Sequence, residues 1–371
     1  MAGRSKISVK RLDFGLLMAA VILMIFGIVS IASATHFEFW GNEDQTWYVK
    51  RQGWFILGSL SVAWFSLRFD YRFLKEISPM IYGLTVLLLL LVMFVGQSAL
   101  GAQRWLQIGP ISIQPSEFAK LAMIIVLGAF LADKVNRLKY WSDILPVFLV
   151  VGIPAALVLK QPDLGTALVF FGILMGTIFV AGIPWKKLGI LFGGALLALP
   201  VFWHFLHDYQ KSRLLVLLDP MRDPLGAGYH VIQSQIAVGS GRFFGKGLFY
   251  GPQSQLNFLP ENHTDFIFSV VGEELGFIGS AFLILVYGYL LYRSLRIAGE
   301  ARDDFGMMLA TGIASMWAFQ LLVNVGMTIG VMPVTGIPLP FVSYGLSSLL
   351  TNIAGLAILQ NIYIRHRKIS F

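Results

Sequence analysis

Long apolar stretches separated by short polar segments run through most of the sequence. Ten of them approach the roughly 20 residues that a helix needs to cross about 30 Å of hydrocarbon. They cover residues 12–34, 53–69, 77–96, 116–132, 144–160, 163–182, 186–207, 266–292, 305–330 and 340–364. The pattern predicts an all-α polytopic membrane protein with ten transmembrane helices, formed as a single domain over residues 1–371.

The positions of the basic residues predict how these helices are oriented. If both termini are cytoplasmic, 18 of the 28 lysines and arginines lie in the terminal segments and loops of that side. Short loops on the other side are then nearly free of positive charge, as the positive-inside rule requires. We therefore expect cytoplasmic N- and C-termini and a large extracytoplasmic loop between helices 7 and 8, over residues 208–264.

The composition excludes several classes of protein. Of 371 residues, 56% are hydrophobic and 13% are charged, against roughly 25% charged in a soluble domain. The chain is therefore neither a soluble globular protein nor a disordered one. With no cysteine it has no disulfide, no thiolate nucleophile and no cysteine-bound metal. The net charge of +8 is explained mostly by topology, so we expect no nucleic-acid partner.

The loop over residues 208–264 is too long to be a simple connection, and function is expected there. Its stretch RLLVLLDP can form a short surface helix. The stretch YHVIQSQIAVGSG is typical of an amphipathic helix that ends at Gly239 and Gly241.

A few ionisable residues lie within or beside the apolar stretches, where they are costly. Glu117 and Lys120 are three residues apart on one helix, so they either neutralise each other or line a cavity. Asp163 begins the sixth stretch and either caps that helix or takes part in function. Helical periodicity places Glu273, rather than Glu274, nearer the side of Asp265.

An irregular stretch, VMPVTGIPLPFVSYG, precedes the tenth helix and contains Ser343 and Tyr344. Irregular backbone at membrane depth is tolerated only where it is buried in protein or lines a watery cavity. We expect this stretch to line the functional site.

The most informative segment is QSQLNFLPENHTDFIF, at the end of the long loop. It places Asp265 at the membrane surface, with His263 and Thr264 beside it and Glu261 four residues earlier. A carboxylate there can take a proton from a sugar hydroxyl or hold a divalent cation against a diphosphate. Thr264 or Asp265 can equally be a simple helix cap, and the residues alone do not decide.

Six motifs in a fixed order resemble those of one family, the SEDS proteins RodA and FtsW. They are GAQRWLQIGPISIQPSEFAK, QPDLGTA, DPLGAGYHVIQSQIAVGSG, GKG, QSQLNFLPENHTDFIFSVVGEELG and IPLPFVSYG. Two of them look more like the RodA branch. The chain departs from the common pattern at Leu346, where a second glycine is usual, and at Arg242, which follows Gly241.

The resemblance implies a peptidoglycan glycosyltransferase of the bacterial cytoplasmic membrane that polymerises lipid II on the outer face. Asp265 matches the family's essential aspartate, so the resemblance implies that it is the general base. Arg104 and Lys120 lie in matched motifs as partners for the diphosphate, whereas Arg213, Arg242 and Lys246 are candidates by charge alone.

Further expectations accompany this activity. Trp105 can stack on a sugar or on the prenyl chain, or can anchor the protein in the membrane interface. Burial, or nearby Glu117 and Glu273, is expected to raise the pKa of Asp265. A divalent cation, Mg²⁺ or Mn²⁺, can bridge Asp265 and the diphosphate.

The resemblance also implies partners. A class B penicillin-binding protein is expected to cross-link the glycan, because this chain carries no SxxK-type nucleophile motif. Other membrane proteins of the elongation complex are expected as well. Two rival functions stay open, a lipid II flippase or transporter, and a non-catalytic scaffold that activates the transpeptidase.

Overall fold

A helix of at least 17 residues lies at each of the ten apolar stretches. The computed structural model describes residues 12–36, 46–99, 102–109, 111–205 and 208–366. The long helices are α1 (Phe14–Ala34), α2 (Trp47–Ser66), α4 (Ser78–Val95), α5 (Pro115–Ala132), α6 (Trp141–Lys160), α7 (Leu164–Val180), α8 (Trp185–Phe205), α12 (Ile267–Gly299), α13 (Asp304–Thr328) and α14 (Leu346–His366).

Within the described part of the chain, seven helices are long and apolar enough to cross a membrane, namely α1, α4, α5, α6, α12, α13 and α14. Helix α7 is apolar but shorter, at 17 residues. Helix α2 begins at Trp47, six residues before the predicted start. A helix can continue past the apolar segment into the polar interface, so its first turn has no hydropathic signal.

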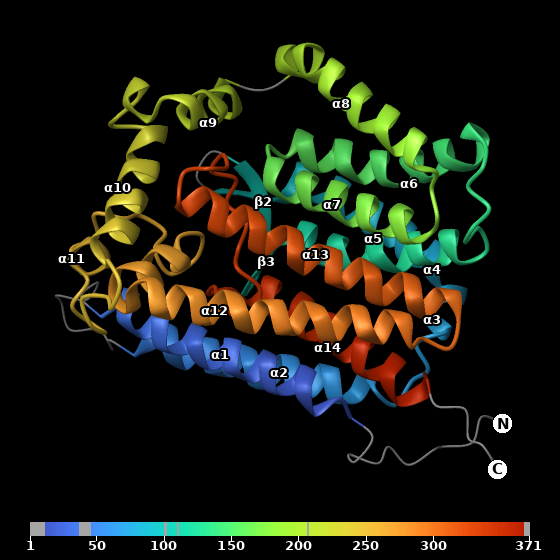
Figure 1. Cartoon of the computed structure of the whole chain (residues 1–371), viewed down its shortest axis with the longest axis horizontal. Coiled ribbons are helices and arrows are strands. Elements are labelled where there is room, and N and C mark those ends of the chain that lie inside the picture. Colours follow the sequence, from blue (N-terminus) through green and yellow to red (C-terminus); the bar gives the residue numbers. More distant parts are fainter. Residues whose placement is uncertain (1–11, 37–45, 100–101, 110, 206–207, 367–371) are drawn as a thin grey trace.

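The long helices lie side by side and share two ends (Figure 1). At the first, which we call the terminal end, the backbone of Asp13 and the side chain of Gln360 exchange two hydrogen bonds of 2.9 Å. The Asp13 carboxylate is also paired with Arg293 of α12. The start of α1 therefore lies beside the end of α14.

The opposite end, which we call the loop end, carries most of the long connection after α8. It contains α9 (Asp208–Leu218), a 3₁₀ turn (Pro220–Arg222), α10 (Ala227–Ser240) and α11 (Pro252–Gln255), grouped at the left of Figure 1. Helix α10 ends at Gly241, close to the predicted position. A four-residue helix, α3 (Phe73–Glu76), lies at the terminal end.

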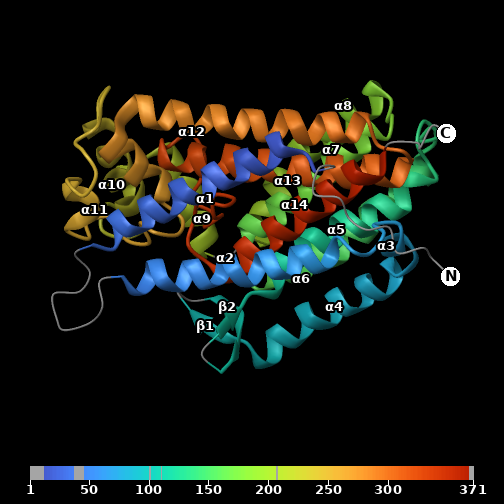
Figure 2. The ribbon, with the colours of Figure 1, turned by 90° about the horizontal axis from the view of Figure 1, so that it is seen from below.

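A small antiparallel sheet between α4 and α5 was not predicted, so the all-α description needs this correction. Its strands are β1 (Gln97–Ala99), β2 (Ala102–Ile108) and β3 (Ile111–Ile113), in the order β1-β2-β3. Trp105 pairs with Gln97, and Leu106 pairs with Ile113. The sheet lies below the start of α2 in the second view (Figure 2). A short hairpin has too few alternating residues to be distinguished from loop by periodicity.

Helix α12 is broken at Gly276, whose φ of 63° and ψ of −158° are not helical. The break frees the amides of Phe277 and Ile278, which donate to the carbonyls of Arg242 and Phe243 at 2.9 and 3.2 Å. A glycine is required there because an added Cβ would lie 2.3 Å from the Gly245 nitrogen. The segment after α10 is thus fixed to the α12 backbone.

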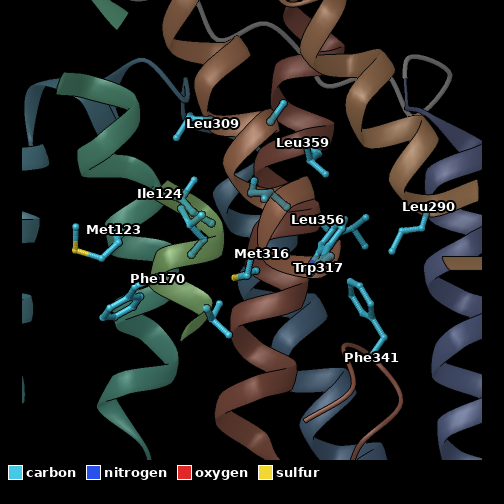
Figure 3. Packing of buried hydrophobic residues seen from close by; sticks show 14 of the residues in the cluster. Met123, Ile124, Phe170, Leu290, Leu309, Met316, Trp317, Phe341, Leu356 and Leu359 are labelled. Carbon is cyan, nitrogen blue, oxygen red and sulfur yellow. The ribbon is translucent and has the colours of Figure 1, made fainter. Parts of the chain in front are cut away.

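The core lies between α5, α7, α12, α13 and α14, around Trp317 of α13. The indole ring lies 5.2 Å from that of Phe341 at an angle of 66°, and its Nε1 donates to Asn352 of α14 at 2.8 Å. Figure 3 shows these apolar side chains, including Met316 and Leu356, meeting between the helices. Phe341 belongs to the irregular segment before α14, which is therefore part of the core.

That irregular segment passes between α1 and α7 at two glycines. An added Cβ on Gly27 would lie 2.6 Å from the Val342 carbonyl oxygen, and one on Gly165 would lie 2.7 Å from that of Thr335. Both contacts are with backbone, which cannot easily move aside. The predicted tenth helix starts late, at Leu346 rather than residue 340, because this segment with its prolines is not helical.

Replacing Gly27 with alanine is expected to destabilise the fold by about 1–3 kcal/mol, because overpacking displaces the segment around Val342. Gly58 of α2 is the matched control, since an added Cβ there meets nothing within 4 Å. Thermal unfolding in detergent measures both variants. Equal melting temperatures for Gly27→Ala and Gly58→Ala would contradict the predicted close packing.

Candidate active site

Asp265 lies in the turn that leads into α12, at the loop end of the bundle. The residue before the helix is Phe266, and no side chain caps this helix start. Thr264 Oγ1 instead donates to the Glu261 carboxylate at 2.9 Å. Capping therefore does not explain Thr264 or Asp265. Within the described chain, no protein group donates a hydrogen bond to the Asp265 carboxylate.

Asp265 lines a cavity of about 200 Å³. Its walls come from the sheet, α5, α9, the turn before α12, the start of α14 and the irregular segment ahead of α14, which was expected to line the site. The lining residues are Arg104, Trp105, Gln114, Glu117, Arg213, Glu261, Thr264, Asp265, Gly336, Pro338, Tyr344, Gly345, Leu346, Ser347 and Ser348. Six of the predicted site residues besides Asp265 therefore share one cavity with it, namely Arg104, Trp105, Glu117, Arg213, Thr264 and Tyr344.

The surroundings of Asp265 set its protonation. Burial, followed by the negative charge of Glu261, raises the pKa of Asp265 to about 7, and Arg213 and Arg104 oppose this rise. A carboxyl group that titrates near neutral pH is well suited to accept a proton during a reaction. The expected rise is therefore present, and burial, one of the two expected causes, is the largest; the acidic neighbours that add to it are Glu261 and Asp163 and not the expected Glu117 and Glu273.

The turn that carries Asp265 is held by two neighbouring elements. The Asn324 side-chain amide of α13 donates to the carbonyls of Asp265 at 2.9 Å and Ile337 at 2.8 Å. The Ser343 hydroxyl donates to the carbonyl of Thr264 at 2.6 Å and accepts from the Leu339 amide at 2.8 Å. Ser343 therefore positions the turn and does not line the cavity.

His263 belongs to the same turn and contacts Tyr344. The Tyr344 amide donates to the His263 carbonyl at 3.0 Å, and the two rings lie 5.6 Å apart. Burial lowers the pKa of His263, so the ring is neutral at pH 7. His263 is thus an uncharged neighbour of Tyr344, and it does not line the cavity.

Arg104 reaches the cavity from β2 and is fixed to the α6–α7 hairpin. Its guanidinium donates to the carbonyls of Gln161 at 3.3 Å and of Pro162. It also lies 3.8 Å from the Asp163 carboxylate. Asp163 caps α7 by accepting from the Thr166 amide at 3.1 Å. The two interpretations of Asp163 are therefore compatible, because one carboxylate caps a helix and faces Arg104.

Glu117 and Lys120 form a buried ion pair of 2.7 Å on α5. Glu117 Oε1 is the paired atom, whereas Oε2 is buried and has no hydrogen-bond partner among the described residues. Glu117 lines the cavity and Lys120 does not. The two charges therefore neutralise each other, and Glu117 also lines the cavity.

Besides Lys120, Asp163, His263 and Ser343, three more predicted site residues do not line the cavity. Lys246 is paired with Glu273 at 3.0 Å, and Glu273 also accepts from the Gln253 and Ser254 amides. Arg242 is exposed, and its backbone carbonyl binds α12. The periodicity that placed Glu273 toward Asp265 assumed one continuous helix, but α12 starts only at Ile267. These residues join the loop to α12.

Several residues of the site were not singled out from the sequence. Gln114, Ser347 and Ser348 line the cavity, and Asn324 holds the Asp265 backbone. Gly336, at φ 69°, approaches so closely that an added Cβ would lie 3.1 Å from Asp265 Oδ2. Gln114 and Ser348 lie within or next to the matched motifs, but only three-dimensional contact gives them a role.

Comparison with known proteins identifies the family. Residues 14–368 match the FtsW/RodA/SpoVE family of cell cycle proteins. The chain is 38% identical to peptidoglycan glycosyltransferase MrdB of Escherichia coli K12 over 358 residues, which cover 96% of this chain and 94% of that protein. It is 39% identical to the probable peptidoglycan glycosyltransferase FtsW of Trichlorobacter lovleyi, over 94% of this chain and 92% of that protein.

Solved structures agree with the sequence comparison. One similar chain belongs to a peptidoglycan synthase complex studied for the coordination of polymerization and crosslinking. It has a TM-score of 0.81 and 34% identity, over 96% of this chain and 99% of that one. The crystal structure of the rod shape determining protein RodA of Thermus thermophilus has a TM-score of 0.71 and 32% identity, over 96% of this chain and 98% of that one. The predicted resemblance is confirmed, and the chain is a multi-pass membrane protein of the FtsW/RodA/SpoVE family.

Proposed function

We propose that this protein is a peptidoglycan glycosyltransferase that polymerises lipid II into glycan strands during cell elongation. The observation that carries the proposal is the cavity in which Asp265 faces Arg104 and Arg213. A proton acceptor and two fixed cations are what a transfer from a diphosphate-linked sugar needs. The relatives named peptidoglycan glycosyltransferase support the same activity.

Asp265 acts as the general base. Its carboxylate takes the proton of the 4-hydroxyl of the acceptor N-acetylglucosamine as that oxygen attacks the anomeric carbon of the donor. The new carbon–oxygen bond forms while the bond from the anomeric carbon to the diphosphate oxygen breaks. Undecaprenyl diphosphate leaves with the electron pair. Because Asp265 accepts no hydrogen bond from the described protein groups, its oxygens are available for this proton.

Arg104 and Arg213 stabilise the charge that develops on the leaving diphosphate. Arg104 is held by the α6–α7 hairpin, and Arg213 Nη1 donates to the Val334 carbonyl at 3.1 Å. Cations fixed before the reaction need little reorganisation during it, which makes them effective in a partly desolvated site. Trp105 lines the same cavity and offers a ring for a sugar or the first prenyl units.

Length and composition identify seven helices that can cross a membrane, and the proposed arrangement adds three more. We propose that α2, α7 and α8 also span the bilayer, which gives ten transmembrane helices in the bacterial cytoplasmic membrane. The terminal end is then cytoplasmic, as the basic residues near both termini favour. The loop end, including the loop over residues 208–264 and the cavity, is extracytoplasmic. Polymerisation therefore takes place at the outer face, where glycan strands are needed.

The proposed partner is a transpeptidase of the class B penicillin-binding proteins. The similarity to a chain of a peptidoglycan synthase complex supports an assembly that joins polymerization to crosslinking. The chain itself has no SxxK-type nucleophile motif, so the crosslinking step requires another protein. Other elongation proteins of the membrane complete the proposed assembly.

A divalent cation fits this site only together with the substrate. Among the described residues, no three or more histidine, aspartate or glutamate side chains come together to hold a metal ion. Mg²⁺ is commonly held by one or two carboxylates and substrate phosphates, and Asp265 and Glu261 line the same cavity. These two residues would hold Mg²⁺ or Mn²⁺, which would supply charge neutralisation for the diphosphate.

Removing the base tests the proposed function directly. Asp265→Asn and Asp265→Ala are expected to lower the polymerisation rate of purified protein by at least about 100-fold, the usual contribution of a general base. Labelled lipid II and gel separation of glycan products measure the rate. Glu300→Gln, an exposed acidic residue, is the control. Wild-type protein that makes no polymer even with its transpeptidase partner would favour a scaffold, and translocation of lipid II between leaflets would favour a flippase.

The pH dependence has a defined sign. The rate is expected to rise as pH increases through about 7, because only the deprotonated Asp265 accepts a proton. Glu261→Gln removes a negative neighbour, lowers the pKa of Asp265 and moves this rise to lower pH. Arg213→Gln removes a positive neighbour and moves it to higher pH, each by a few tenths of a unit. Shifts in the same direction for both variants would contradict this assignment of the titrating group.

Chelation tests the proposed cation. Incubation with EDTA followed by its removal is expected to lower the polymerisation rate, and added Mg²⁺ or Mn²⁺ is expected to restore it, because the diphosphate charge is then only partly neutralised by Arg104 and Arg213. The measurement is the initial rate at fixed lipid II concentration. An unchanged rate after chelation would assign the whole of this neutralisation to the two arginines.

A further inference from the structure

A row of aromatic rings leads from the surface at the start of α2 to the cavity. The Trp47 ring lies 4.9 Å from that of Tyr48, at 90°. The Tyr48 ring lies 5.1 Å from that of Tyr344, at 79°, and 4.8 Å from that of His263. Tyr344 lines the cavity beside Asp265, whereas Trp47 is 43% exposed. The rings therefore form a continuous path between solvent and the site.

The outer end of the path is stabilised by contacts between a cation and two rings. The Arg51 guanidinium lies 4.8 Å from the centre of the Trp47 ring and 5.4 Å from that of Phe55. The Phe55 ring in turn lies 6.1 Å from the Tyr344 ring. Such cation–π and edge-to-face contacts hold side chains in one arrangement. Trp47 is therefore in contact with Arg51 and Tyr48 and is partly exposed to solvent.

The chemistry of the path differs from that of the cation-lined wall of the cavity. Arg104 and Arg213 come from β2 and α9, whereas the rings come from α2 and the turn segments around His263 and Tyr344. The electron-rich faces of such rings attract cations and weakly positive C–H groups, and they repel anions. The sugar rings of a glycan strand present such C–H groups, whereas a diphosphate is an anion. Apart from the Arg51 guanidinium at its outer end, the path consists of aromatic side chains, and burial lowers the pKa of His263, which favours its uncharged ring.

We propose that Trp47, Tyr48 and Tyr344 form a glycan-binding surface that holds the uncharged sugar units of the strand beside Asp265. Its ligand is a β-1,4-linked chain of N-acetylated sugars, and it leaves the diphosphate to Arg104 and Arg213. The inference rests on the proposed function. It adds α2, which the lining of the cavity does not include, to the elements that bind substrate.

Membrane anchoring is the competing explanation, because tryptophan and tyrosine are common at bilayer interfaces. Helix α2 provides a matched control in Trp54, two turns further along and 72% exposed. No ring contact is found for Trp54 within the described residues. An anchoring role makes the two tryptophans equivalent, whereas glycan binding distinguishes Trp47 from Trp54.

Binding of chitotetraose, a β-1,4-linked tetramer of N-acetylglucosamine, tests the proposal on the full-length protein in detergent. Saturation-transfer NMR titration is expected to show about five- to tenfold weaker binding for Trp47→Ala and Tyr48→Ala. Trp47→Phe, which keeps a ring, is expected to restore most of the affinity, and Trp54→Ala to bind as wild type does. Equal affinities for wild type, Trp47→Ala and Tyr48→Ala, or no binding by any of them, would overturn the proposal.

Product length provides a second measurement in the polymerisation assay. Trp47→Ala is expected to yield shorter glycan strands, because a growing strand held less firmly dissociates earlier, whereas Trp54→Ala leaves the length unchanged. If Trp47→Ala polymerises at a normal rate and its strands have wild-type length, the proposed glycan-binding surface is contradicted. A different result would contradict the proposed function itself, namely full polymerisation activity of Asp265→Asn.

Discussion

The side-chain amide of Asn324 joins the two irregular segments from which the site is built. It donates to the carbonyl of Asp265, ahead of α12, and to that of Ile337, ahead of α14. Both segments lie in a bundle of apolar helices, where an unpaired backbone group costs several kcal/mol. Ser343, which bonds Thr264 and Leu339, forms a second bridge between the same segments. These bridges satisfy backbone groups of both segments that a regular helix would otherwise pair.

The same contacts that satisfy the backbone also determine the electrostatics. Arg213 is placed by the Val334 carbonyl of the irregular segment, and its charge then lowers the pKa of Asp265. Arg104 is placed by the carbonyls of Gln161 and Pro162, in a tight hairpin between two helices. Each cation is therefore fixed by backbone oxygen atoms instead of by a direct ion pair with Asp265. The carboxylate stays available while its neighbours are held.

The sequence predicted much of the fold because lipid imposes a simple requirement. Ten apolar stretches correspond to ten long helices, and the glycine after α10 ends that helix as expected. Hydropathy reports which residues face lipid or the core, but it does not report pairing between distant segments. The β-strands that carry Arg104, and the hydrogen bonds from Asn324 to two distant segments, were therefore not predicted. Gly336 beside Asp265 was equally unpredictable, since its role depends on a contact across 71 positions of sequence.

The contrast between Glu273 and Asp265 shows how hydrogen bonding separates structural carboxylates from reactive ones. Both residues belong to matched motifs and lie within one stretch of sequence. Glu273 accepts from Lys246, from two backbone amides and from the Ser254 hydroxyl, so its charge is fully compensated and holds the loop against α12. The Asp265 carboxylate accepts no hydrogen bond within the described chain, and burial is the largest cause that raises its pKa to about 7. A carboxyl group that is desolvated and accepts no hydrogen bond gains stability by taking a proton. The turn ahead of α12 therefore places the reactive carboxylate in the cavity, where it accepts no hydrogen bond from the described helix backbone.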